Sequence, residues 1–182
     1  MKTPTRVYLD NAATTAIRPE VIDAMTEVLQ SFYGNPSSIH ADGRKARSLV
    51  EQARKTVAYN IGASIGEIFF TSGGTESNNT ALKCAVRDLG VRRIISSPIE
   101  HHCILHTLDR LRQTDEIECL LLDVNELGQP DLKQLAQLLA DDSLPTLVSL
   151  MHSNNEIGTI NDIEKVAELC ANYKAYFHTD SV

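Results

Sequence analysis

From residue 67 onward the chain alternates short apolar runs with longer segments of helical periodicity, and this alternation limits the possible fold more than any other feature. The apolar runs predict strands at residues 67–70, 92–96, 117–122, 146–151 and 175–178. The segments between them place apolar residues three and four apart, as helices with one buried face do. Apolar strands separated by helices are typical of a parallel sheet that is covered by helices. We therefore predict an α/β fold, preceded by a helix that Pro19 opens and a second helix that ends at Gly62.

The first predicted strand runs into two glycines and then into a helix. Gly73 and Gly74 follow the aromatic run, and Thr75 and Glu76 begin the helical pattern that ends at Gly90. The free N–H groups and the positive dipole end of such a helix suit a phosphate group. The turn contains neither G-x-G-x-x-G nor G-x-x-x-x-G-K-[ST]. An ordinary turn before a capped helix is therefore an equally open interpretation.

Composition excludes several classes of protein. The formal net charge of −7 argues against a nucleic-acid or anionic-membrane surface, and no apolar run is long enough to cross a bilayer. The first residues do not have a signal-peptide pattern. The four cysteines form no C-x-x-C pair, which fits a reducing, cytoplasmic environment.

Polar residues gather where four of the predicted strands end. These residues are Gly74-Thr75, Glu100-His101-His102, His152 with Asn154-Asn155-Glu156, and Asp180. Because parallel strands end at one edge of a sheet, we expect these groups to share a cleft. A phosphate cradle, an imidazole, an amide and a carboxylate together suit pyridoxal phosphate. Its phosphate must be held, its ring covered, its phenolic oxygen hydrogen-bonded and its ring nitrogen kept protonated.

Each of these residues also has a structural interpretation. His101 could cap a helix, Asn155 could form a plain turn and Asp180 could cap a following helix. Their shared position at strand ends favours the functional interpretation. His102 and His106 are four residues apart on a predicted helix, but no third ligand is evident, so we expect no metal site.

Six segments in order carry recognisable motifs, at residues 8–15, 34–43, 70–78, 100–102, 151–158 and 178–180. Together they resemble the cysteine desulfurases of the class V aminotransferase group, which have the type I pyridoxal-phosphate fold. The resemblance extends over essentially the whole chain, and its Asn154–Gly158 segment favours the branch that supplies sulfur for iron–sulfur clusters and thio-modified RNA.

The resemblance implies both an activity and roles for individual residues. The family removes sulfur from L-cysteine to give L-alanine and a protein persulfide. Gly74 and Thr75 would hold the phosphate, and His101 would stack on the ring and act in catalysis. Asn155 would contact the phenolic oxygen, and Asp180 would pair with the ring nitrogen. The resemblance also implies a three-layer αβα large domain, incomplete in this chain, from residue 16 to 182. Residues 1–15 would belong to a small domain.

The partners implied by the resemblance are L-cysteine and a sulfur-acceptor or iron–sulfur scaffold protein, with a homodimer for the full-length form. The Schiff-base lysine and the persulfide cysteine of the family have no counterpart before Val182. Four lysines fall on helix patterns and not at a strand end that faces the cleft, namely Lys83, Lys133, Lys165 and Lys174. None of the four cysteines matches the persulfide cysteine. We therefore expect the chain to be an N-terminal portion that is inactive by itself. We also expect residues 67–71 to pair with none of the other strands present, and the isolated chain not to be a stable monomer.

Three alternatives remain open from the sequence. A selenocysteine lyase shares the motifs. A different phosphate-binding α/β enzyme would leave His101 and Asp180 unexplained. A non-catalytic binding or regulatory fragment is the third.

Overall fold

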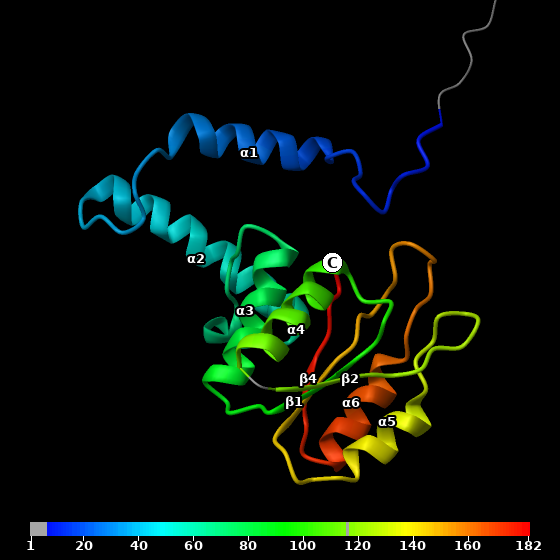
Figure 1. The fold of residues 1–182 in the computed structure, drawn as a ribbon. Coiled ribbons are helices and arrows are strands. Elements are labelled where there is room, and N and C mark those ends of the chain that lie inside the picture. Colours follow the sequence, from blue (N-terminus) through cyan, green and yellow to red (C-terminus); the bar gives the residue numbers. More distant parts are fainter. Residues whose placement is uncertain (1–6, 116) are drawn as a thin grey trace, which may run out of the picture. The chain divides into compact units, whose positions relative to one another are not determined.

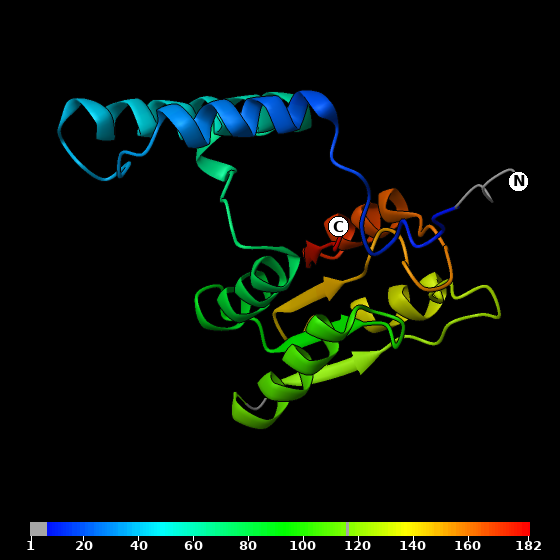
Figure 2. The same ribbon diagram turned by 90° about the horizontal axis from the view of Figure 1, so that it is seen from above.

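A computed structural model describes residues 7–115 and 117–182, which divide into two units, one ending at Phe70 and the other running from Thr71 to Val182. The second unit contains a four-stranded sheet made of β1 (Arg93–Ser96), β2 (Glu118–Leu121), β3 (Thr146–Ser149) and β4 (Tyr176–His178). The strand order is β2-β1-β3-β4, and every neighbouring pair is parallel. The strand arrows accordingly point the same way in Figure 2. The α/β prediction is confirmed.

Helices cover both faces of this sheet (Figure 1). The helices α3 (Gly74–Arg87) and α4 (His102–Thr114) lie on one face, and α5 (Leu132–Leu139) and α6 (Ile163–Asn172) lie on the other. Alternate residues of β1 point to opposite faces. Ile94 therefore packs with Leu82 and Leu108, whereas Ile95 packs with Leu135 and Val166. The second unit is thus a three-layer αβα sandwich.

The first unit is helical. Its elements are α1 (Pro19–Ser31), α2 (Ala41–Ile61) and the short 3₁₀ helix η1 (Ile65–Glu67). Pro19 opens α1 as predicted, and α2 ends at Gly62, whose φ of 69° is the left-handed conformation that favours glycine. α1 buries none of its side chains, so its apolar face is exposed. No helix in the described ranges is long and apolar enough to cross a membrane.

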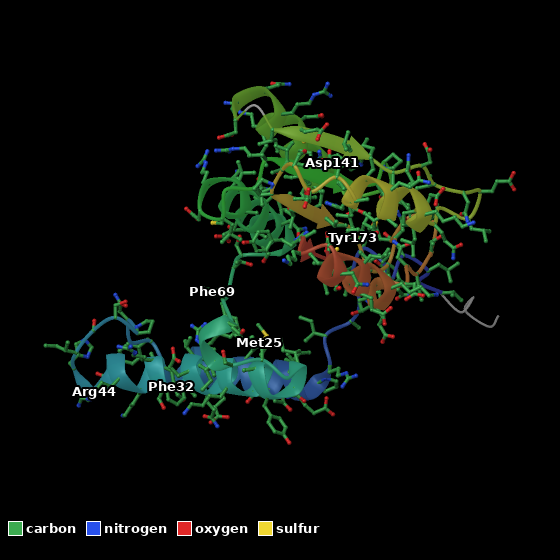
Figure 3. The ribbon with its side chains drawn as sticks, turned by 90° about the horizontal axis from the view of Figure 1, so that it is seen from below. Met25, Phe32, Arg44, Phe69, Asp141 and Tyr173 are labelled. Carbon is green, nitrogen blue, oxygen red and sulfur yellow. The ribbon has the colours of Figure 1, made fainter. Side chains whose placement is uncertain are left out.

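The predicted strand at residues 67–70 is wrong. Residues 65–67 form η1, and Ile68 is extended but pairs with none of the four strands. An extended segment needs a neighbouring strand for its backbone groups, and here the Arg54 side chain donates to the Ile68 carbonyl and lies over the Phe70 ring instead. Phe69, labelled in Figure 3, is 80% exposed.

Two predicted helix starts are displaced. α5 begins at Leu132, not at Pro130, because the Asp131 side chain accepts hydrogen bonds from the N–H groups of Lys133 and Gln134. α6 is capped by Asp162 and not by Asn161, whose side-chain amide donates to the Met151 carbonyl at 2.8 Å. In each case an adjacent aspartate makes the cap.

Lys174 is also not helical. It lies in the turn before β4 with a φ of 56°. Lys83, Lys133 and Lys165 lie on α3, α5 and α6 as predicted.

Candidate active site

All five residues that the sequence singled out lie in the second unit, near the carboxyl ends of its strands. His101 follows β1, Asn155 follows β3 and Asp180 follows β4. The chain beyond β3 stays beside the chain beyond β4, because the N–H of His152 donates to the Asp180 carbonyl at 2.8 Å. Gly74 and Thr75 begin α3.

The turn before α3 is fixed by hydrogen bonds between Ser72 and Glu76. The Glu76 carboxylate accepts hydrogen bonds from the Ser72 N–H at 2.6 Å and from the Ser72 hydroxyl at 2.7 Å. These bonds lower the pKa of Glu76. Within the described part of the chain, the backbone N–H groups of Gly74 and Thr75 have no acceptor, as expected at a helix N-terminus. A Cβ atom on Gly74 would lie 2.7 Å from Val182 Cγ2, so a larger residue here would require the Val182 side chain to shift.

Asp180 is buried and oriented by two donors. The Asn78 side-chain amide donates to Asp180 Oδ2 at 2.8 Å, and the Val182 N–H donates to Oδ1 at 3.2 Å. Asp180 is 9% exposed and Asn78 only 4% exposed. Asn78 lies one helical turn after Gly74, so one face of α3 carries both the glycine turn and the donor to Asp180.

His101 caps α4, as its structural interpretation predicted. Its Nδ1 accepts a hydrogen bond from the Cys103 N–H at 3.2 Å and lies 3.0 Å from Cys103 Sγ. Because Nδ1 is an acceptor, a neutral His101 ring carries its proton on Nε2. Cys103 Sγ is in turn 3.4 Å from the Asn78 amide. The cap therefore belongs to a chain of polar contacts that runs from His101 through Cys103 and Asn78 to Asp180.

Asn155 lies on a turn that its neighbour Asn154 builds. The Asn154 amide donates to the Ile99 carbonyl at 2.7 Å, and its oxygen accepts from the N–H groups of Glu156 and Ile157. Asn154 is buried, whereas Asn155 is exposed. Asn155 and His101 line the same pocket, which has a volume of about 350 Å³.

The structure adds Glu100 as a functional candidate. The sequence analysis named this residue only as part of the Glu100-His101-His102 motif and gave it no role. It is 5% exposed, and its Oε1 accepts from the Ser97 hydroxyl at 3.1 Å and the Met151 N–H at 2.9 Å. Its Oε2 is buried without a hydrogen-bond partner among the described residues. Burial raises the pKa of Glu100 to about 7, and the charge of Asp180 adds to this rise.

A larger pocket of about 440 Å³ lies at the amino ends of the strands, and its lining includes Asp141, Tyr173 and Lys174. Asp141 and Tyr173 are labelled in Figure 3. Asp141 is already engaged there, because its carboxylate accepts from Arg93 at 2.6 Å. Arg93 also pairs with Glu118 on β2 at 2.5 Å. These ion pairs join the amino ends of the strands, so we interpret the charged groups on this side as structural.

The groups at the carboxyl edge fit the chemistry of pyridoxal phosphate. The glycine turn offers unpaired N–H groups for a phosphate, and the buried Asp180 carboxylate can keep a ring nitrogen protonated. The His102 and His106 rings stack with centroids 6.0 Å apart, but the described residues contain no group of three potential metal ligands.

Known proteins resemble this chain over nearly its whole length. Residues 7–182 match the aminotransferase class-V family. The cysteine desulfurase IscS of Dictyoglomus turgidum is 46% identical over 181 residues, which are 97% of this chain and 44% of the relative. The mitochondrial cysteine desulfurase of Drosophila melanogaster is 42% identical over 178 residues, or 96% of this chain and 38% of the relative. The chain therefore spans less than half the length of these relatives.

This chain is also similar in structure to solved proteins of the same kind. A NifS-like protein superposes with a TM-score of 0.91 at 37% identity, over 98% of this chain and 49% of that one. The structure of SspA in complex with cysteine gives a TM-score of 0.86 at 31% identity, over 96% of this chain and 50% of that one. On the sequence match and the fold together, this chain belongs to the aminotransferase class-V family, whose members depend on pyridoxal phosphate, and is homologous to its cysteine desulfurases.

Proposed function

We propose that this chain forms the phosphate- and ring-binding half of a cysteine desulfurase. Such an enzyme takes sulfur from L-cysteine and leaves L-alanine and a protein persulfide for iron–sulfur cluster or thio-RNA synthesis. The observation that carries the proposal is the polar connection from His101 through Cys103 and Asn78 to Asp180. Two candidate ring-binding residues are thereby linked through the helix whose first residues would hold the phosphate.

Each residue has a defined task in this proposal. The N–H groups at Gly74 and Thr75 bind the phosphate, since the start of α3 presents unpaired donors and a positive dipole end. Asp180, held by Asn78, keeps the ring nitrogen protonated. When bound, the protonated ring supplies the electron sink that cleavage at the substrate carbon requires.

His101 and Asn155 act from the pocket that they share. His101 covers the ring, and because its Nδ1 is occupied by the α4 cap, its Nε2 is the atom that holds or moves a proton. Asn155 donates to the phenolic oxygen, since the buried Asn154 fixes the turn and leaves the Asn155 amide free. The homologous SspA structure contains cysteine, which supports L-cysteine as the substrate here.

The test uses a joined protein, defined as residues 1–182 followed by the segment of the Dictyoglomus turgidum relative that lies beyond its match. Supplied with pyridoxal phosphate, L-cysteine and a thiol reductant, it should release alanine and sulfide in equal amounts. A parallel assay with L-selenocysteine distinguishes a selenocysteine lyase. If the joined protein folds and binds the cofactor but releases no alanine from L-cysteine, the proposal is wrong, and alanine from L-selenocysteine alone would indicate a selenocysteine lyase.

A further inference from the structure

Two buried carboxyl groups lie at the same edge of the sheet. Among the described residues, Glu100 and Asp180 are the only buried carboxylic side chains. They follow β1 and β4, and they are close enough for the charge of Asp180 to disfavour ionisation of Glu100. Two like charges in a buried site are unfavourable, so one of the two groups should be neutral.

The hydrogen bonds of the two groups show which one is neutral. Asp180 accepts a bond on each of its oxygens, from Asn78 and from Val182, as a carboxylate does. Glu100 accepts both of its bonds on Oε1, and no described residue bonds to Oε2. This one-sided pattern fits a carboxylic acid whose carbonyl oxygen is Oε1 and whose proton is on Oε2.

Within the described ranges, no Lys or Arg side chain forms an ion pair with Glu100. His101 and His102 at the start of α4 and Glu156 on the turn after β3 line the same pocket as Glu100. On β4, burial lowers the pKa of His178, which keeps this ring neutral beside Asp180. No salt bridge to Glu100 exists within residues 7–115 and 117–182.

We propose that Glu100 is a positioning residue that works as a neutral carboxylic acid. It joins the chain after β1 to the chain after β3 through Ser97 and Met151, and it leaves Asp180 as the one buried carboxylate beside the ring nitrogen. Its role toward Asp180 rests on the proposed function. The neutral state of Glu100 rests on its burial, its hydrogen bonds and the nearby charge of Asp180, and its link between the strands rests on its hydrogen bonds.

Three substitutions in the joined protein separate a neutral role from a charged one. Glu100→Gln keeps an acceptor at Oε1 and places an uncharged donor at the position of the Oε2 proton. At pH 6, below the pKa of about 7 of Glu100, this variant should bind pyridoxal phosphate within about twofold of the unsubstituted protein, because Glu100 is then mostly protonated and little charge is lost. Glu100→Ala leaves the Met151 N–H buried without a partner and should weaken binding about tenfold or more. Glu168→Gln removes an exposed negative charge on α6 and serves as the matched control.

A second readout needs no cofactor. With ¹³C-labelled glutamate carboxyls, the one NMR signal that disappears in Glu100→Gln should titrate near pH 7. In Ser97→Ala the same signal should titrate at higher pH, because the lost hydroxyl donor had favoured the ionised form. Hydrogen exchange of the Met151 N–H should stay slow in Glu100→Gln and become fast in Glu100→Ala. The titration of the Glu100 signal still decides the inference if Glu100→Ala does not fold.

The outcomes distinguish the inference from the proposed function. If Glu100→Gln loses cofactor affinity as severely as Glu100→Ala, or if the Glu100 signal titrates with the exposed glutamates, Glu100 does not act as a neutral acid. If the unsubstituted protein fails to bind pyridoxal phosphate, the proposed function fails, and with it the role toward Asp180. The titration and the Met151 exchange then still confirm or refute the neutral link between the strands.

Discussion

At the scale of single residues, the site depends on how Asp180 is held. Its two oxygens accept bonds from Asn78 on α3 and from the Val182 N–H, so its orientation is set by groups on both sides. In Asp180→Asn the carboxylate charge is lost and one of these donors faces an amide N–H₂ group. We expect turnover of the joined protein to fall well over tenfold, whereas cofactor affinity changes less, because the charge matters most as the ring accepts electrons. Steady-state kinetics at saturating cofactor would contradict this assignment if turnover were unchanged.

We expect the protonation of Glu100 to make the free energy of unfolding depend on pH. Its folded-state pKa of about 7 is above the ordinary 4.5, so the folded state binds the proton more tightly than the unfolded state does. The resulting stability is fully present below pH 4.5 and is lost as the pH rises to 7, by about 3 kcal/mol at most. Denaturant unfolding between pH 4.5 and 8 should show this loss. Glu100→Gln should remove it, and an equal loss in Glu100→Gln would rule out Glu100 as its source.

The sequence predicted where the candidate site residues lie in the fold, but it did not predict the hydrogen bonds and burial that connect them. Gly74, Thr75, His101, Asn155 and Asp180 could be named because each follows a predicted strand, and parallel strands end together. Asn78 could have been noticed as the residue one helical turn after Gly74, but a partner 102 positions away is not visible in the sequence. The importance of Glu100 depends on its burial, which the motif around it does not reveal.

At the scale of elements, periodicity predicted the four strands of the sheet within one or two residues. The starts of α5 and α6 differ from the prediction because a neighbouring aspartate caps each helix. Proline at 130 and asparagine at 161 are both reasonable first residues, yet Asp131 and Asp162 form the caps. The strand predicted at residues 67–70 failed for a different reason, since apolar composition cannot supply a neighbouring strand.

The α5 cap provides a test at this scale. Asp131→Ala removes the acceptor for the N–H groups of Lys133 and Gln134. A lost cap costs about 1 kcal/mol, so exchange of these two amides should become about fivefold faster in the joined protein. Asp142→Ala, an exposed aspartate in the loop after α5, is the control and should leave both rates unchanged. Unchanged exchange in Asp131→Ala would mean that Asp131 does not cap α5.

At the scale of the whole molecule, we expect exposed apolar surface to determine whether the 182-residue chain self-associates. Leu29 and Met25 on α1 are 78% and 53% exposed, and Phe69 is 80% exposed. In the described sheet, β2 and β4 are both edge strands with unpaired backbone groups on one side. Surfaces of this kind mark interfaces or cause association.

We therefore expect the chain by itself to self-associate or aggregate, and the joined protein to be soluble. Light scattering of the chain alone should give masses well above the 20.1 kDa of one copy. A monodisperse species of 20.1 kDa with a single cooperative unfolding transition would contradict this expectation.

The central claim is that the carboxyl edge of the second unit binds pyridoxal phosphate in one defined orientation. A crystal structure of the joined protein with the bound cofactor tests it most directly. The account predicts the phosphate at the N–H groups of Gly74 and Thr75, the ring beneath His101, the phenolic oxygen at Asn155 and the ring nitrogen within hydrogen-bond distance of Asp180. A cofactor bound at this edge with its ring nitrogen away from Asp180, or bound elsewhere on the protein, would contradict the account.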